Sequence, residues 1–435
     1  MNMDEAQSFL GQHLNYEARP IRADPMDPGH MPTLDRIEQL VQLLGDPHKS
    51  YPVIHITGTN GKSSVARIVT ALMISKGLKV GTFISPHLEH LNERISVNGE
   101  PISDGELEEA FGAIALVEPD VNERLTVFEI LTASAYRYFA DEAVDVAVIE
   151  VGMGGEWDAT NVVEADVAVV TTIGLDHAEF LGNERESVAA TKAGIIKPNS
   201  IVVSGETEPN LIEIFAERRS RGVLVRDRDF GCISNEIAHG GRMLSIRTPY
   251  GIHDDVYLAL HGSHQGDNAA VAVTAVEAFF DSALESVLVH EALGIVRSPG
   301  RMEIMSRRPL LIIDGAHNVE GAEAAAATIA DEFSSVSRRT LVIGLLAGRD
   351  PGEILKAFVN VGFERVIACT PPNYRALQAG EVAAAGAALG VETASCDEVG
   401  DAIALAVSEA AAEDLVLITG SLYVVGAARS LVHRP

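Results

Sequence analysis

His55-Ile-Thr-Gly-Thr-Asn-Gly-Lys-Ser-Ser64 joins the apolar run Val53 to Ile56 to the helix-like segment Val65 to Ser75. A short β-branched strand, a glycine-bearing turn and a helix form a common arrangement that aims backbone N–H groups at a phosphate. The same turn could serve chain geometry alone, but its Lys-Ser ending is typical of a loop that binds a nucleotide. We therefore predict that nucleotide phosphates bind at this turn.

Each residue type in the loop has its own task. The glycines let the backbone take conformations closed to other residues, the lysine supplies a cation for the terminal phosphates, and a serine offers a hydroxyl near Mg²⁺. The loop is not a strict G-x-x-x-x-G-K-[ST] motif, because Ile56 stands where the first glycine should be. The predicted nucleotide-binding residues of the loop are Gly58, Thr59, Asn60, Gly61, Lys62, Ser63 and Ser64.

Composition limits the possible partners and the compartment. The chain has 435 residues, enough for two or three domains, and its 47% hydrophobic content is typical of a soluble globular protein. Its net charge of −29 argues against nucleic acid and acidic membranes as partners, because such a surface repels phosphates. Three separated cysteines suggest neither a disulfide framework nor a zinc site. No apolar run approaches the length of about 18 residues that a membrane span needs, so we expect no membrane insertion. The cysteine pattern fits a reducing cytoplasm, and we expect a monomer.

Strand-like and helix-like runs alternate along the chain, which predicts an α/β fold with two domains. The first, residues 1–297, should be a phosphate-loop ATPase domain with a mainly parallel sheet, a small β-hairpin region and an irregular arm near residues 15–33. The second, residues 298–435, should be a Rossmann-like α/β domain. The predicted strands after the loop are Val80 to Ile84, Val144 to Val151, Val167 to Thr172, the hairpin Met243 to Thr248 with Val256 to Leu260, Leu310 to Ile313, Leu341 to Ile343, Val366 to Ala368 and Leu415 to Ile418. One more strand, helix and strand should lie between Ile201 and Val225.

Polar residues follow several predicted strands, at the sheet edge where open α/β sheets bind ligands. Glu150 ends a buried strand and is the first Mg²⁺ candidate, although a carboxylate there could instead bond the N–H groups of the following glycine turn. His177 follows the next strand, where a neutral imidazole can complete a metal or nucleotide site, unless it is simply solvated. Asp267 is a plausible N-cap of an alanine-rich helix, which places Asn268 in the first turn of that helix.

Eight groups of motifs occur along the chain in a fixed order. They are H-I-T-G-T-N-G-K at His55 to Lys62; S-P-H-L and N-E-R-I at Ser85 to Leu88 and Asn92 to Ile95; E-V-G-M-G-G and D-A-T-N at Glu150 to Gly155 and Asp158 to Asn161; G-L-D-H-A-E-F-L-G at Gly174 to Gly182; K-A-G-I-I-K at Lys192 to Lys197; P-G-R at Pro299 to Arg301; D-G-A-H-N at Asp314 to Asn318; and T-G-S-L-Y at Thr419 to Tyr423. Together they resemble the dihydrofolate synthase/folylpolyglutamate synthase family, a branch of the Mur-type ATP-dependent amide ligases.

The resemblance implies an ATP-dependent ligase that adds L-glutamate to dihydropteroate, to the γ-carboxylate of a folate, or to both. It also implies that Ser85, Glu150 and His177 gather one Mg²⁺ and that Lys192 is carbamylated to hold a second. A carbamate requires a neutral amine, so Lys192 should lie where burial or neighbouring cations depress its pKa. Composition alone would leave a lysine of this helix, which is expected to run to about Ile196, on a solvated face.

The resemblance assigns the remaining roles by position. Lys62, Lys192 and His177 would be the catalytic residues, and the partners would be small molecules only: dihydropteroate or folates, L-glutamate and ATP. The implied nucleotide contacts outside the loop are Asn268, Arg301, Asp314 and His317, of which the last three reach across from the second domain. The implied contacts on the acceptor side are Arg94, Phe128 and Asp158.

Two positions depart from the family pattern. Ser63 stands where the family often has glycine, which leaves open which serine of the loop contacts a metal. Glu156 stands where the family usually has a cation, which would reverse the charge beside the acceptor pocket. Two other functions remain: a cell-wall precursor ligase that uses the same ATP chemistry, and a nucleotide-binding module without catalysis. A dinucleotide-dependent oxidoreductase is disfavoured because no G-x-G-x-x-G follows an early strand.

Overall fold

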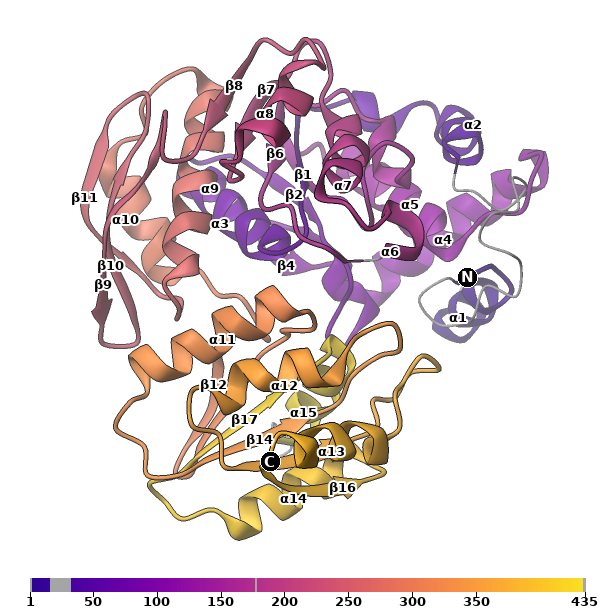
Figure 1. The fold of residues 1–435 in the computed structure, drawn as a ribbon. Coiled ribbons are helices and arrows are strands. Elements are labelled where there is room, and N and C mark those ends of the chain that lie inside the picture. Colours follow the sequence, from indigo (N-terminus) through magenta and orange to yellow (C-terminus); the bar gives the residue numbers. More distant parts are fainter. Residues whose placement is uncertain (1, 16–32, 177, 433–435) are drawn as a thin grey trace.

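The computed structural model describes residues 2–15, 33–176 and 178–432. Almost all of the expected N-terminal arm lies outside these residues, as does the metal candidate His177. The described chain forms two α/β units and a small antiparallel sheet (Figure 1). None of the helices in the described ranges has the length and hydropathy needed to span a membrane.

An eight-stranded sheet with the order β4-β3-β2-β5-β1-β6-β7-β8 organises the N-terminal unit. All pairs from β2 to β8 are parallel, whereas the β2–β3 and β3–β4 pairs at one edge are antiparallel. The predicted mainly parallel sheet is therefore confirmed. Its strands are β1 (Val53–Thr57), β2 (Val80–Phe83), β3 (Ile95–Val97), β4 (Glu100–Pro101), β5 (Val146–Glu150), β6 (Val167–Val170), β7 (Ile201–Ser204) and β8 (Gly222–Val225).

Helices cover both faces of this sheet, which explains why its central strands are apolar throughout rather than alternating. Ile54 and Ile56 of β1 pack in a core with α3, α9 and α10, while Val53 packs on the opposite face in a core with α2, α4 and α5. A third core joins α7 and α8 to the β6–β7 side of the sheet. The helices of this unit are α1 (Met3–Gly11), α2 (Asp35–Leu43), α3 (Lys62–Ser75), α4 (Asp104–Val117), α5 (Val127–Asp141), α6 (Ala178–Leu181), α7 (Arg185–Lys192), α8 (Pro209–Ala216), α9 (His264–Phe280) and α10 (Ser286–Ile295).

The predicted hairpin is part of a three-stranded antiparallel sheet, β11-β10-β9. Its strands are β9 (Gly231–Ala238), β10 (Gly241–Arg247) and β11 (Ile252–Leu258). The sequence did not predict β9, because most of this edge strand is partly or fully exposed and its residues lack a clear apolar alternation. The predicted N-cap Asp267 was wrong: Ser263 is at the N-cap position of α9, without a side-chain capping bond, and Asp267 lies in the first turn, where it pairs with Arg226.

A six-stranded sheet with the order β12-β13-β17-β14-β15-β16 organises the C-terminal unit, and every pair except β12–β13 is parallel. Helices α11 to α13 pack on one face and α14 and α15 on the other, which confirms a second α/β unit. The boundary between residues 297 and 298 stays a prediction. The elements are β12 (Glu303–Arg307), β13 (Leu310–Ile313), α11 (Val319–Glu332), β14 (Arg339–Ile343), α12 (Pro351–Val359), β15 (Arg365–Cys369), α13 (Ala379–Ala388), β16 (Glu392–Cys396), α14 (Val399–Glu409), β17 (Leu415–Thr419) and α15 (Leu422–Val432).

The strand order places the predicted site at one sheet edge. Strands β2, β5, β1 and β6 are neighbours and parallel, so the segments that follow them meet at their common carboxyl edge. Those segments carry Ser85, Glu150, the phosphate loop and Asp176 in turn. Residues far apart in the sequence are thereby brought to one place.

Candidate active site

The phosphate loop, residues 58–61, connects the end of β1 to the start of α3. Gly58 and Gly61 have φ angles of +145° and +86°, which side chains rarely allow. A Cβ on Gly58 would lie 1.8 Å from Thr171 Oγ1, and a Cβ on Gly61 would lie 2.6 Å from Asn268 Oδ1. Both glycines are therefore required by backbone conformation and by space, and Asn268 lies directly beside the loop.

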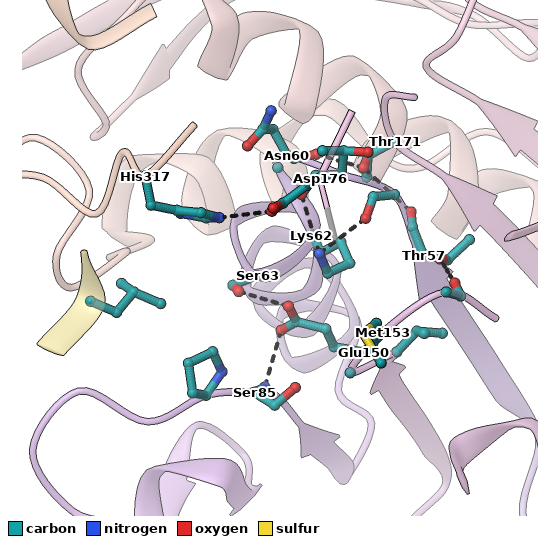
Figure 2. Close-up of a pocket in the computed structure, with 18 of the residues that line it drawn as sticks. Thr57, Asn60, Lys62, Ser63, Ser85, Glu150, Met153, Thr171, Asp176 and His317 are labelled. Carbon is teal, nitrogen blue, oxygen red and sulfur yellow. Dashed lines mark hydrogen bonds and ion pairs between the residues drawn. The ribbon is translucent and has the colours of Figure 1, made fainter. Parts of the chain in front are cut away.

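Two lysine side chains converge on this loop. Lys62 Nζ donates to the carbonyl oxygens of Gly58 at 3.0 Å and Thr59 at 3.2 Å (Figure 2). Lys192 Nζ donates to the same Gly58 carbonyl at 2.8 Å. Because like charges this close disfavour each other, the second amine has reason to be neutral.

Lys192 is the last residue of α7 and is only 4% exposed. Burial, followed by the charge of Lys62, lowers the pKa of Lys192 from 10.5 to about 7, against smaller opposing effects of Asp176 and Asp158. The predicted pKa depression is thus confirmed. The helix ends earlier than predicted, because the 3-10 turn Ala193–Ile195 follows it.

Glu150 ends β5 and is 1% exposed. Ser63 Oγ donates to its Oε1 at 2.9 Å, and the backbone N–H of Ser85 approaches its Oε2 at 3.4 Å (Figure 2). Burial raises the pKa of Glu150, while the charge of Lys62 and the Ser63 hydroxyl act in the opposite direction without cancelling that effect. The charge of Arg301 acts in the same direction as that of Lys62, so two cationic side chains favour the ionised form of this buried carboxylate.

The donor atoms at this carboxylate fit a magnesium ion, because Mg²⁺ prefers oxygen ligands and keeps phosphate oxygens among them. Of the two loop serines, Ser63 lies at Glu150, whereas Ser64 is buried and faces Ser298 Oγ at 3.4 Å. In the described parts of the chain, no group of three or more His, Cys, Asp and Glu residues could hold a metal. A magnesium ion here would therefore depend on serine hydroxyls and nucleotide phosphates as well as on Glu150.

The predicted residues of the C-terminal unit face the loop from the other side. Asp314 follows β13, is 7% exposed and accepts from the backbone N–H groups of Met302 at 2.9 Å and Ala316 at 2.8 Å. The Arg301 guanidinium lies over Gly315, where a Cβ would be 2.8 Å from Arg301 Nη1. Both side chains line the same cavity as the phosphate loop.

His317 makes contact across the two units. Its Nε2 lies 3.2 Å from Asp176 Oδ2, and the two side chains point toward each other (Figure 2). Arg349 Nη2 donates to the other oxygen of Asp176 at 3.0 Å. Nearby, Asn60 Nδ2 donates to Glu320 Oε2 at 3.1 Å, so the phosphate loop itself contacts α11.

Of the three predicted acceptor-side residues, Phe128 and Asp158 contact the glycine turn that follows β5. The Phe128 ring packs on Gly152, where a Cβ would be 2.5 Å from its Cζ. Asp158 is buried and accepts from the backbone N–H groups of Met153 and Thr160, so in this structure it holds the turn in shape. Arg94 is also buried.

All predicted site residues within the described chain line one cavity of about 790 Å³. This volume is in the usual range for a site that binds small molecules. The cavity walls come from both units, as expected for a site that brings a nucleotide and an acceptor together. The predicted residues in its lining are Gly58, Thr59, Asn60, Gly61, Lys62, Ser63, Ser64, Ser85, Arg94, Phe128, Glu150, Asp158, Lys192, Asn268, Arg301, Asp314 and His317.

The cavity also contains residues that the sequence did not single out. Trp157 and Phe180 add aromatic surface to the lining, and Asp176 and Arg349 join the two units. Asp176 could have been found from its place in the quoted G-L-D-H motif, whereas Arg349 follows β14 without a recognised motif. Glu156, the other departure from the family pattern, is exposed and is absent from the cavity lining.

Comparison with protein families gives two matches that together extend over most of the chain. The family model described as Mur ligase middle domain matches residues 56–276. The model described as Mur ligase, glutamate ligase domain matches residues 300–422. The phosphate loop lies in the first matched region and Arg301 in the second, and both line the same cavity.

Similar proteins and structures extend the comparison over nearly the full length. A Mycobacterium tuberculosis protein named dihydrofolate synthase/folylpolyglutamate synthase is 40% identical, with 93% of this chain and 90% of that chain covered. A Bacillus subtilis protein of the same name is 34% identical, with 91% and 94% covered. The structure of Mycobacterium tuberculosis folylpolyglutamate synthase complexed with ADP matches with a TM-score of 0.90 at 38% identity, with 100% of this chain and 98% of that one covered. Escherichia coli FolC in complex with DHPP and ADP matches with a TM-score of 0.86 at 28% identity, with 99% and 98% covered.

Proposed function

This chain belongs to the Mur ligase family, in the branch of the dihydrofolate synthases and folylpolyglutamate synthases, and from this membership we propose that it adds L-glutamate to dihydropteroate, to the γ-carboxylate of a reduced folate, or to both. It is an ATP-dependent ligase. The observation that carries the proposed reaction is the convergence of Lys62 and Lys192 on the phosphate loop, beside Glu150, in a cavity closed by the C-terminal unit.

ATP is needed because a carboxylate is a poor electrophile. In the first step, an oxygen of the acceptor carboxylate attacks the γ-phosphorus of ATP, ADP leaves, and an acyl phosphate forms. The loop N–H groups orient the transferring group, and Lys62 exchanges its bonds to the Gly58 and Thr59 carbonyls for the nucleotide phosphates. Arg301 and His317 contact the nucleotide from the C-terminal unit.

In the second step, the neutral amine of L-glutamate attacks the acyl carbon and forms the C–N bond. The C–O bond to the phosphoryl group breaks, inorganic phosphate leaves with the electron pair of that bond, and the nitrogen loses a proton to give the amide. The acyl phosphate must be kept from water, which would otherwise hydrolyse it. The contacts of Asp176 with His317 and Arg349 hold the two units together over the cavity, and this closure excludes water during the reaction.

The residues that would hold Mg²⁺ are Glu150, the serines at its carboxylate and, by resemblance, His177. When bound, the ion neutralises the phosphate oxygens and so lowers the cost of bringing a carboxylate to them. Lys192, with its depressed pKa, is suited to carry a carbamate for a second ion. Glu150 keeps Ser63 oriented toward this position through the hydrogen bond to its carboxylate.

The acceptor would lie against the glycine turn that follows β5. Phe128 and Trp157 offer aromatic faces that suit a flat heteroaromatic ring system such as a pterin. Arg94 supplies a positive charge in a protein whose net charge is −29, so it can attract the acceptor's carboxylates locally. The position of Glu156 outside the lining leaves both proposed acceptors possible.

The test is phosphate release from ATP and Mg²⁺ in the presence of L-glutamate, with 7,8-dihydropteroate and tetrahydrofolate compared in parallel. Mass spectrometry should find one added glutamate on each acceptor that supports release. Release with one acceptor alone would assign a single activity, and no glutamate-dependent release with either would refute the proposal. Lys192→Ala should bind ATP but lose turnover, whereas full activity of this variant would exclude the second-metal role.

A further inference from the structure

The docking loop, residues 85–94, follows β2 in the N-terminal unit yet packs against the C-terminal unit. It begins at Ser85, whose backbone N–H approaches Glu150, and ends at Arg94. Both end residues line the cavity, whereas Leu88 and Glu89 between them do not. Leu88 and Glu89, in the middle of the loop, therefore cannot contact a molecule bound in the cavity directly.

Leu88 inserts into the C-terminal unit. Its side chain packs against the core that contains Val424, Val425 and Ala428 of α15. A Cβ on Gly300, the residue before Arg301, would lie 3.1 Å from Leu88 Cδ1. The backbone is equally close, because a Cβ on Gly426 would lie 2.1 Å from the Leu88 carbonyl oxygen. Gly426 thus lets α15 rest directly on the backbone of the docking loop.

Glu89 adds an ion pair and a hydrogen bond beside this apolar contact. Its carboxylate pairs with Arg429 and accepts from Ser430 Oγ at 2.8 Å, and both partners are on α15. Arg429 is held in turn by Glu303 of β12, with Nε 3.2 Å from Oε1. The Glu89 side chain is only 13% exposed, so the pair is partly shielded from solvent and is worth more than an open surface ion pair.

Glu93 makes the loop stiff enough to transmit a displacement. Its carboxylate accepts from the backbone N–H groups of Leu88 at 2.9 Å, Glu89 at 2.9 Å and His90 at 2.8 Å. Three hydrogen bonds to one partly buried carboxylate leave the turn little freedom to deform locally. A movement of Leu88 or Glu89 will therefore shift the ends of the loop.

One end of the loop, Ser85, lies at the proposed Mg²⁺ position, and the other end, Arg94, belongs to the proposed acceptor side. Ser85 lies at the Glu150 carboxylate, and Arg94 Nε donates to His87 Nδ1 at 2.9 Å within the loop. Displacements on the order of 1 Å at positioning groups are enough to reduce catalysis strongly. The contact with α15 is thus able to control both groups at once.

We propose that Leu88 and Glu89 are positioning residues, which place Ser85 and Arg94 in the cavity only while the C-terminal unit is docked on the loop. The proposal rests on the proposed function, because it takes the Glu150 end of the cavity as the Mg²⁺-nucleotide site. In this proposal, Gly426, Arg429 and Ser430 of α15 hold Leu88 and Glu89 in place, so the position of the C-terminal unit determines the position of the loop.

Gly426→Ala tests the proposal, because its Cβ would push α15 away from the Leu88 carbonyl. The matched control is Gly380→Ala, which adds a Cβ within α13 of the same unit where nothing lies within 4 Å. Calorimetry would measure the affinity of each variant for a β,γ-methylene ATP analogue with and without Mg²⁺. We expect the gain in affinity from Mg²⁺ to fall about tenfold in Gly426→Ala and to stay at the wild-type value in Gly380→Ala.

An unchanged Mg²⁺-dependent gain in a folded Gly426→Ala protein would overturn the proposal. If that variant does not fold, Glu89→Gln serves instead, and Glu89→Asp should restore part of the lost gain because it keeps the charge opposite Arg429. Equal values for Glu89→Gln and wild type would also overturn it. The binding measurement needs no turnover, so its failure is distinct from failure of the proposed function, which the wild-type protein tests by glutamate-dependent phosphate release.

Discussion

Lys192→Met should make the protein more stable and at the same time inactive. The substitution keeps an unbranched side chain of similar length in the buried site and removes the amine. In the folded protein the pKa of Lys192 falls from 10.5 to about 7, chiefly because the amine is buried and secondly because Lys62 is near. At about 1.4 kcal/mol for each tenfold change in proton affinity, this difference corresponds to about 5 kcal/mol.

The sign of the pH dependence follows from proton binding. Between pH 7 and pH 10.5 the unfolded chain holds the Lys192 proton while the folded chain releases it, so stability rises with pH across this window. The full cost of the buried ammonium is present below about pH 7. Lys192→Met removes this cost, so its gain in unfolding free energy should approach about 5 kcal/mol at pH 6 and shrink steadily toward pH 10.

Urea unfolding followed by fluorescence measures this gain, because Trp157 is the one tryptophan of the chain and lines the same cavity as Lys192. Buffers free of CO₂ at pH 6, 7.5 and 9 avoid stabilisation by a carbamate. Lys356→Met on the exposed side of α12 is the matched control and should show no such pH-dependent gain. A gain that is absent at pH 6, or the same at pH 6 and pH 9, would refute the assignment of Lys192 as a desolvated amine.

Three further substitutions test separate parts of the site. Gly58→Ala should reduce ATP affinity by about 100-fold in calorimetry, because its Cβ would lie 1.8 Å from Thr171 Oγ1. Gly105→Ala is the control, because nothing lies within 4 Å of the Cβ that it adds. Retained ATP affinity in Gly58→Ala would contradict the loop geometry. Burial raises the pKa of Glu150, so the acid limb of a kcat/KM profile against pH should lie above the usual glutamate range. Glu150→Gln should lose Mg²⁺-dependent turnover at every pH. An acid limb at the ordinary glutamate pKa would argue against Glu150 as the group that controls activity at low pH. Phe128→Ala should raise the acceptor KM about tenfold and leave the ATP KM unchanged, since its ring packs on Gly152 away from the loop, and equal changes in both KM values would place Phe128 elsewhere in the reaction.

Most of the fold could be predicted because its central strands carry strong local signals. The strands β1, β5 and β17 are buried at every position and are rich in Val and Ile, so their apolar runs are visible without any knowledge of partners. Five strands were missed: β3 and β4, which have only three and two residues, and β9, β12 and β16. All of these except β3 are edge strands, and β9, β12 and β16 have exposed positions and weak patterns. Edge strands are stabilised by pairing with a neighbouring strand, and this pairing cannot be predicted from the residues of the edge strand alone.

Helix ends were harder to predict than helix positions. Asp267 looked like an N-cap because aspartate favours that place, but Ser263 occupies it and Asp267 is drawn to Arg226. Similarly, α7 ends at Lys192 rather than near Ile196. The chain after it packs tightly on the glycine turn, where a Cβ on Gly194 would lie 2.3 Å from Glu156 Cα. In both cases a tertiary contact outweighed a local preference.

The sequence alone determined the phosphate loop, because strand, glycine turn, lysine and helix are contiguous and their geometry follows from local backbone preferences. The resemblance carried by its motifs implied that Lys192 needed a depressed pKa if it was to carry a carbamate. Only the tertiary structure decided how that depression arises: the fold brings Lys192 from a distant part of the chain onto the Gly58 carbonyl that Lys62 also uses, and buries its side chain there. The docking of Leu88 and Glu89 on α15 was likewise decided in three dimensions, since contacts between residues so far apart in the chain depend on how the two units pack and leave no pattern in either segment.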